Sequence, residues 1–140
     1  MTEFLWPVRV YYEDTDSGGV VYYANYLKFM ERARTELFRA QGFEQDQLLA
    51  QSGVLFVVRK VEMDLLKPAR FNDALEVKTT IKTFARTNII FNQTIHQSAA
   101  ESTPLASAQI QIVCIDAERW KPTAIPPSII SALNEAGEQA

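Results

Sequence analysis

One long helical stripe followed mainly by strand-like segments is the feature that most constrains the fold of this chain. Apolar residues recur at helical spacing from Tyr26 to Leu37, and Gly42 is placed to end the helix. After Gly53 the pattern changes to an alternation of apolar and polar residues, which is typical of strands with one buried face. One long helix therefore has to cover the apolar faces of the strands.

The strand-like segments set the order of the elements. They are Trp6–Tyr12 before the helix and 54–66, 75–83, 89–95 and 106–115 after it. A change of phase at Arg59-Lys60 predicts a β-bulge, and short helices are predicted over Glu44–Ala50 and Ser128–Glu135. This order predicts an α+β fold with a five-stranded antiparallel sheet curled around the long helix. Strand faces that the helix does not cover need another partner, so we expect the protein to form an oligomer.

Length and composition fit one domain over residues 1–140. Lys and Arg total 14 against 17 for Asp and Glu, and the net charge of −3 argues against a nucleic-acid-binding protein, which is usually basic. No apolar run approaches the roughly 20 residues of a membrane span and no secretory signal is visible, so we expect no membrane insertion. With one cysteine and no export signal, the cytoplasm is the expected location.

Cys114 and His96 are too few for a Cys/His zinc site, and we expect no metal. The apolar register of Cys114 predicts a small buried side chain, and His96 is predicted to face solvent or to be hydrogen-bonded rather than catalytic. The stretch Glu31–Arg34 is interpreted as a helix face with intrahelical ion pairs, or as an interface contact. Nucleotide-binding, hydrolase-elbow and zincin motifs are missing.

An acidic, glycine-containing segment precedes the helix. Asp14 and Asp16 are followed by Gly18-Gly19 and the helix start. Glycines let the backbone approach a ligand closely, and a helix start offers unpaired N–H groups that polarise a carbonyl oxygen. A carboxylate beside such donors can attack the carbonyl carbon or activate water against it. From the local pattern alone, helix caps and Asx turns are the commoner explanation.

The run 8–36, with its core Asp14-Thr-Asp-Ser-Gly-Gly-Val-Val-Tyr22, closely resembles the acyl-CoA thioesterases associated with the Tol-Pal system. These belong to the 4-hydroxybenzoyl-CoA thioesterase group of hotdog-fold proteins. The likeness continues through Phe56–Lys60, Pro68–Arg70, Asp73–Glu76 and 121–126, and so covers nearly the whole chain. It implies a hotdog fold and hydrolysis of an acyl-CoA thioester to a carboxylic acid and coenzyme A, with no metal or redox cofactor.

The resemblance assigns roles to particular residues. It places the catalytic aspartate at Asp16, as nucleophile or general base, and the thioester oxygen at the backbone N–H of Tyr23. Substrate is expected to lie against Gly19, Val20 and Tyr22. Relatives often have a histidine where this chain has Tyr23, but a backbone donor does not depend on the side chain, so activity is still expected. A thiol with a pKa of about 8.5 leaves as thiolate, so no dedicated strong acid is required.

Basic side chains are expected to bind the coenzyme A phosphates. Each candidate is equally well interpreted as an ordinary surface cation. They are Arg59, Lys60, Arg86 and, more weakly, Lys121. Tyr26 and Phe29 either line an acyl tunnel with Tyr22 or belong to the core. The family implies a homodimer, expected to pair into a homotetramer, with sites formed between subunits.

Two other functions stay open from the sequence. A module that binds acyl carrier protein or an envelope-biogenesis partner, with little turnover, is favoured by the missing histidine at position 23. A hotdog dehydratase would need a proton-transferring histidine near a carboxylate, and His96 lies in the wrong element. Neither the acyl group nor the choice between coenzyme A and acyl carrier protein as its carrier follows from the sequence.

Overall fold

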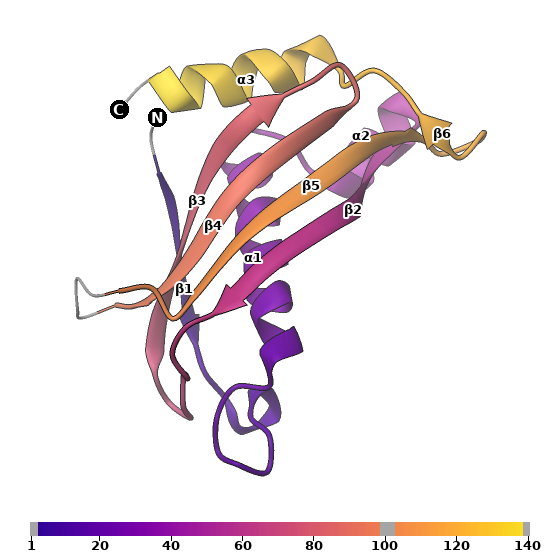
Figure 1. The fold of residues 1–140 in the computed structure, drawn as a ribbon. Coiled ribbons are helices and arrows are strands. Elements are labelled where there is room, and N and C mark those ends of the chain that lie inside the picture. Colours follow the sequence, from indigo (N-terminus) through magenta and orange to yellow (C-terminus); the bar gives the residue numbers. More distant parts are fainter. Residues whose placement is uncertain (1–2, 99–102, 139–140) are drawn as a thin grey trace.

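A curved antiparallel sheet wraps around one long helix in the computed structural model, which describes residues 3–98 and 103–138 (Figure 1). The helix is α1 (Tyr23–Ala40). In the order β1-β3-β4-β5-β2, the sheet contains β1 (Phe4–Arg9), β3 (Ala74–Phe84), β4 (Asn88–Gln97), β5 (Ala106–Asp116) and β2 (Val54–Leu65). The predicted α+β fold with an antiparallel sheet around the helix is confirmed.

The apolar stripe of α1 is buried against the sheet. Phe29, Met30 and Ala33 have no exposed surface, and β3, β4 and the first half of β5 bury alternate residues, as the period-two pattern predicted. Burial of a side chain such as Phe29 or Met30 contributes about 1.5–3 kcal/mol. Gly42 stops the helix as predicted, because it adopts a φ of 91° just beyond the last turn. This packing fixes the start of α1 relative to the sheet.

Several boundaries differ from the prediction. Strand β1 ends at Arg9 rather than Tyr12, because 12–14 form a 3-10 turn whose Asp14 carboxylate accepts the Tyr11 N–H at 2.8 Å. A two-residue strand, β6 (Lys121–Pro122), pairs with β5 and makes the sheet six-stranded rather than five-stranded. The predicted bulge is confirmed by a register shift between Val58 and Lys60, and a second shift in β3 was not predicted.

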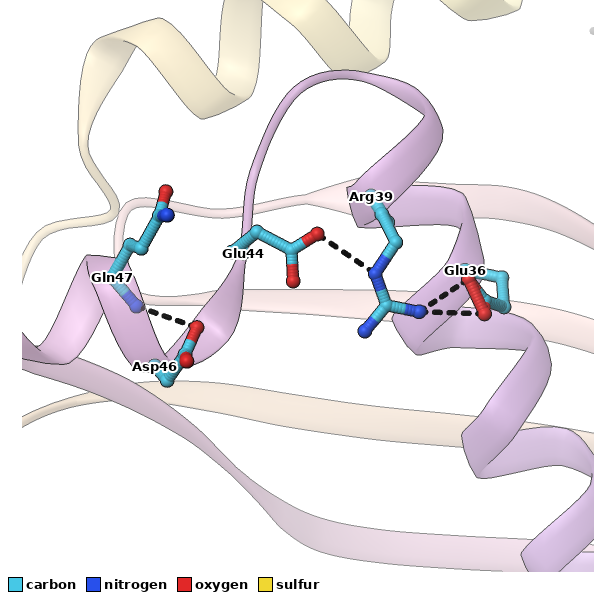
Figure 2. A network of polar contacts seen from close by, with 5 residues as sticks. All are labelled: Glu36, Arg39, Glu44, Asp46 and Gln47. Atoms are coloured by element: carbon cyan, nitrogen blue, oxygen red, sulfur yellow. Dashed lines mark hydrogen bonds and ion pairs between the residues drawn. The ribbon is translucent and has the colours of Figure 1, made fainter.

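Two further helices flank the core. They are α2 (Gln45–Ser52) and α3 (Pro127–Glu138). Arg39 ties the end of α1 to the start of α2, since its guanidinium contacts the carboxylates of Glu36 and Glu44 (Figure 2). These ion pairs raise the pKa of Arg39. In the described part of the chain, every helix is too short or too polar to span a lipid bilayer.

The chain's cysteine and histidine lie as predicted. Cys114 has no exposed surface, and its burial raises the pKa of the thiol to about 11. His96 is partly buried and its Nε2 lies 2.8 Å from the hydroxyl oxygen of Thr94. Both side chains are accounted for by packing and hydrogen bonding.

Candidate active site

Asp16 lies in a tight loop that leads into α1. Its backbone N–H donates to the carbonyl of Val20 at 2.9 Å, and its carbonyl accepts the Gly19 N–H at 3.1 Å. One carboxylate oxygen, Oδ1, accepts the Gly18 N–H at 2.8 Å, so the Asx-turn interpretation also holds. The other oxygen accepts no hydrogen bond within the described residues and is free to act on a ligand.

The two glycines of this loop suit its geometry. A Cβ at Gly18 would lie 3.2 Å from Oδ1 of Asp16, so any side chain there would press on the carboxylate. Gly19 has a φ of 81°, a left-handed conformation that other residues adopt only under strain. The pair therefore holds the Asp16 carboxylate in place and leaves open space beside it.

Buried polar contacts fasten the loop to the rest of the fold. The carbonyl of Asp14 accepts the Tyr22 N–H at 2.9 Å and the Asn25 amide at 2.8 Å. Val21 donates to the carbonyl of Ala69, in the β2–β3 connection, and the Ala69 N–H donates to the hydroxyl of Tyr26. Asp14 is 8% exposed and has a structural role in holding the loop. Asp16 is exposed and is the residue available to a ligand.

The start of α1 faces solvent beside this loop. Tyr22 is the N-cap residue and Tyr23 is the first helical residue, with side chains 47% and 54% exposed. No oxygen in the described part of the chain accepts the Tyr23 N–H, as expected for the first turn of a helix. The chain thus brings Asp16, Gly19, Val20, Tyr22 and Tyr23 into one loop and helix start.

Tyr26 and Phe29 belong to the core rather than to an open tunnel. They are 3% and 0% exposed, and their rings meet edge to face. Burial raises the pKa of the Tyr26 phenol. The same hydroxyl accepts the Ala69 N–H, and the Ala69 carbonyl accepts the Val21 N–H. Tyr26 is therefore connected to the loop through Ala69.

The predicted phosphate-binding cations lie on separate elements. Arg59 and Lys60 are exposed at the bulge of β2, where Lys60 pairs with Glu62 at 2.9 Å. Arg86 lies in the β3–β4 turn, at the far end of β3 from the Asp16 loop. The length of β3 between these two ends is roughly 33 Å. Lys121 is exposed in β6, which pairs with the end of β5 nearest to that turn. One chain does not gather these cations around Asp16.

A buried polar network was missed by the sequence analysis. Arg34, expected on a surface with intrahelical ion pairs, is only 7% exposed and donates to Oε1 of Gln93 at 3.0 Å. For Arg34 the ion-pair interpretation was wrong, because Arg34 shares the inward-facing side of α1. The alternative, an interface contact, stays a prediction. The amide of Gln93 donates to the Met30 carbonyl and to the Thr79 hydroxyl, both at 2.9 Å. The available signal was a polar residue, Gln93, in an otherwise apolar register.

Comparison with known proteins identifies the family. Residues 10–133 match the profile of the thioesterase-like superfamily. The chain belongs to the thioesterase-like superfamily. The acyl-CoA thioester hydrolase YbgC of Escherichia coli is 48% identical over 134 residues, which cover 96% of this chain and 98% of that protein.

Two solved structures extend this result for the thioesterase-like chain. A probable thioesterase from Bartonella henselae is 35% identical, with a TM-score of 0.81 over 89% of this chain and 100% of that one. A 1,4-dihydroxy-2-naphthoyl-CoA thioesterase from Synechocystis shares the fold, with 24% identity and a TM-score of 0.88 over 97% and 98% of the two chains. The hotdog fold is confirmed, and this thioesterase-like protein is a thioester hydrolase.

Proposed function

We propose that the protein hydrolyses acyl-CoA thioesters, with Asp16 as the catalytic carboxylate. The supporting observation is the loop geometry: a carboxylate with one free oxygen is held by Gly18-Gly19 next to a helix start whose Tyr23 N–H is unpaired. The Escherichia coli relative, an acyl-CoA thioester hydrolase that is 48% identical, supports the same substrate class.

The reaction needs a nucleophile at the acyl carbon and a donor for its oxygen. As general base, Asp16 takes a proton from water while the water oxygen bonds to the acyl carbon. As nucleophile, the carboxylate forms that bond itself, and water later hydrolyses the anhydride. In both routes the Tyr23 N–H stabilises the negative oxygen, the C–S bond breaks, and the electron pair leaves on sulfur.

Three further properties follow from this proposal. A coenzyme A thiol with a pKa of about 8.5 leaves as thiolate, so the reaction proceeds without a metal or redox cofactor. Arg59, Lys60 and Arg86 bind coenzyme A phosphates, each reaching a site formed with another subunit. We also propose that the enzyme works in the cytoplasm in association with the Tol-Pal system, on the resemblance of the run 8–36.

A second copy of the chain completes the site. Asp16 is exposed in one chain, whereas an enzyme site is expected to be a cleft that limits access of bulk water and holds the substrate. The two sheet edges differ, since β1 is short and contains Pro7, while β2 is twelve residues long with Val58 49% and Val61 40% exposed. A long edge strand with exposed apolar side chains is the better candidate for pairing with a partner. We propose a homodimer joined along β2, and a homotetramer of two such dimers.

We expect dissociation of this dimer to abolish turnover. Light scattering and activity assays over a dilution series test this. The activity per chain is expected to fall in step with the dimer fraction, because a monomer exposes Asp16 to bulk water. A monomer with the full activity of the dimer would contradict a site shared between subunits.

The hydrolase assignment is tested by thiol release from a panel of acyl-CoA thioesters that differ in chain length and in aromatic content. We expect turnover of part of the panel. The same acyl groups on acyl carrier protein form the second arm and identify the preferred carrier. Tight binding of acylated carrier protein without cleavage on either carrier would instead identify a binding module, the alternative that Tyr23 in place of histidine favours.

A further inference from the structure

A groove of about 440 Å³ lies between α1 and the edge strand β2. Its walls are largely apolar and come from α1, β2 and β5, through Leu27, Val58, Val61 and Ile110. Arg34 lines the same groove, although it is one of the few charged side chains that the fold buries. The proposed hydrolysis at Asp16 does not by itself require a guanidinium at this place.

The guanidinium of Arg34 has unused hydrogen-bonding capacity. It carries five N–H donors, and within the described residues it donates one hydrogen bond, to Oε1 of Gln93 at 3.0 Å. It forms no ion pair there. Gln93 is itself fully buried, and its amide bonds to Met30 and Thr79 fix the direction of Oε1. The network therefore holds Arg34 in one orientation, and Arg34 lines the groove with donors that no described residue accepts.

The charge around the groove is unbalanced. Lys28, Arg32 and Arg34 line it against a single carboxylate, that of Glu31. Burial lowers the pKa of Arg34 to about 10, and the nearby Glu31 carboxylate offsets only part of this effect, so the guanidinium still carries its charge at neutral pH. Because a buried charge is costly without a partner, the groove favours a ligand that brings a negative group to Arg34.

The groove lies along the same helix, α1, that begins at the proposed catalytic centre. Tyr23, Leu27 and Arg34 follow one another at intervals of four and seven residues and so share one face of α1. Arg34 lies eleven residues beyond Tyr23, about 16 Å along the helix axis, and helical side chains point back toward the N-terminus. An acyl group whose carbonyl oxygen accepts the Tyr23 N–H can therefore extend past Leu27 toward Arg34.

We propose that this groove is the acyl subsite and that Arg34 selects acyl groups that end in a carboxylate, that is, the monothioesters of dicarboxylic acids. The proposal rests on the proposed function, because it uses the Tyr23 N–H as the position of the thioester carbonyl. The methylene chain contacts the apolar walls. The terminal carboxylate accepts hydrogen bonds from the guanidinium N–H groups of Arg34 that do not donate to Gln93. Acyl groups too short to span the distance gain nothing from a terminal carboxylate.

The test compares matched pairs of acyl-CoA thioesters of increasing length, one member ending in a methyl group and the other in a carboxylate. For the wild-type enzyme we expect kcat/KM to favour the carboxylate member by about ten- to a hundredfold once the chain reaches Arg34. This comparison needs no variant. A wild-type enzyme that hydrolyses both series equally at every length overturns the proposal, whereas one that cleaves no thioester overturns the proposed function instead.

Arg34→Met supplies the second arm, with Arg39→Met as the matched control on the exposed side of the same helix. We expect Arg34→Met to lose the preference for the carboxylate series, measured as the ratio of kcat/KM between the two members of each pair. Arg34→Lys retains the charge without the planar fork and should retain only part of the preference. Equal losses on both series, accompanied by loss of the dimer in light scattering, would assign Arg34 to subunit contact and overturn the proposal.

Discussion

Replacing Asp16 with asparagine is expected to lower kcat for thioester hydrolysis by about 10²–10⁴-fold, the usual contribution of a positioned general base. The amide oxygen of asparagine can still accept the Gly18 N–H, which Asp16 holds at 2.8 Å, so the loop keeps its shape. What is lost is an oxygen that can take a proton or attack carbon. Initial rates of thiol release measure the effect, and circular dichroism verifies the fold.

Asp46→Asn is the matched control for this substitution. Asp46 is also exposed, and its Oδ1 also accepts a local backbone N–H, that of Gln47, at 2.8 Å (Figure 2). The control thus removes the same charge from the same kind of hydrogen bond at the start of α2. We expect its kcat to stay close to wild type. Near-wild-type turnover by a folded Asp16→Asn enzyme would remove Asp16 from the mechanism, and equal losses in both variants would point to net charge.

The sequence predicts an element well when its apolar residues recur at one period and form one buried face. The stripe from Tyr26 to Leu37 and the alternation in β3 and β4 both predicted the observed core, because burial repeats at the period of each element. The bulge at Arg59 was visible for the same reason, since one extra residue exchanges the two faces. In contrast, β6 consists of two exposed residues, and no such pattern accompanies it.

The site was predicted less completely, since its parts depend on contacts between distant residues. Asp16 and the helix start are local in sequence, so their motif could be recognised together. The bond between Arg34 and Gln93 joins positions 59 residues apart, and only the packing of α1 on β4 brings them together. Asp16 is exposed in a single chain, and the second wall that we propose for its cleft belongs to another subunit, which the sequence of one chain does not display.

Tyr23→Pro is expected to lower kcat by about 10²–10³-fold, the loss typical of removing one oxyanion donor. Proline has no N–H, so the substitution removes the proposed donor itself. The position tolerates it, because Tyr23 is the first helical residue, where proline is favoured. The preceding residue, Tyr22, has φ −62° and ψ 126°, an extended conformation that is compatible with a following proline.

Tyr23→Ala separates the backbone donor from the side chain. Alanine removes the exposed phenol ring but keeps the N–H, so we expect its kcat to remain within about tenfold of wild type, with any larger change in KM. Thermal unfolding should show both variants folded, since the Tyr23 N–H has no partner in the described structure to lose. If the alanine and proline variants are equally active, the thioester oxygen does not use this N–H. If both are equally inactive, the phenol of Tyr23 is the essential group. The histidine that relatives often have at this position would then be expected to replace the phenol in that role.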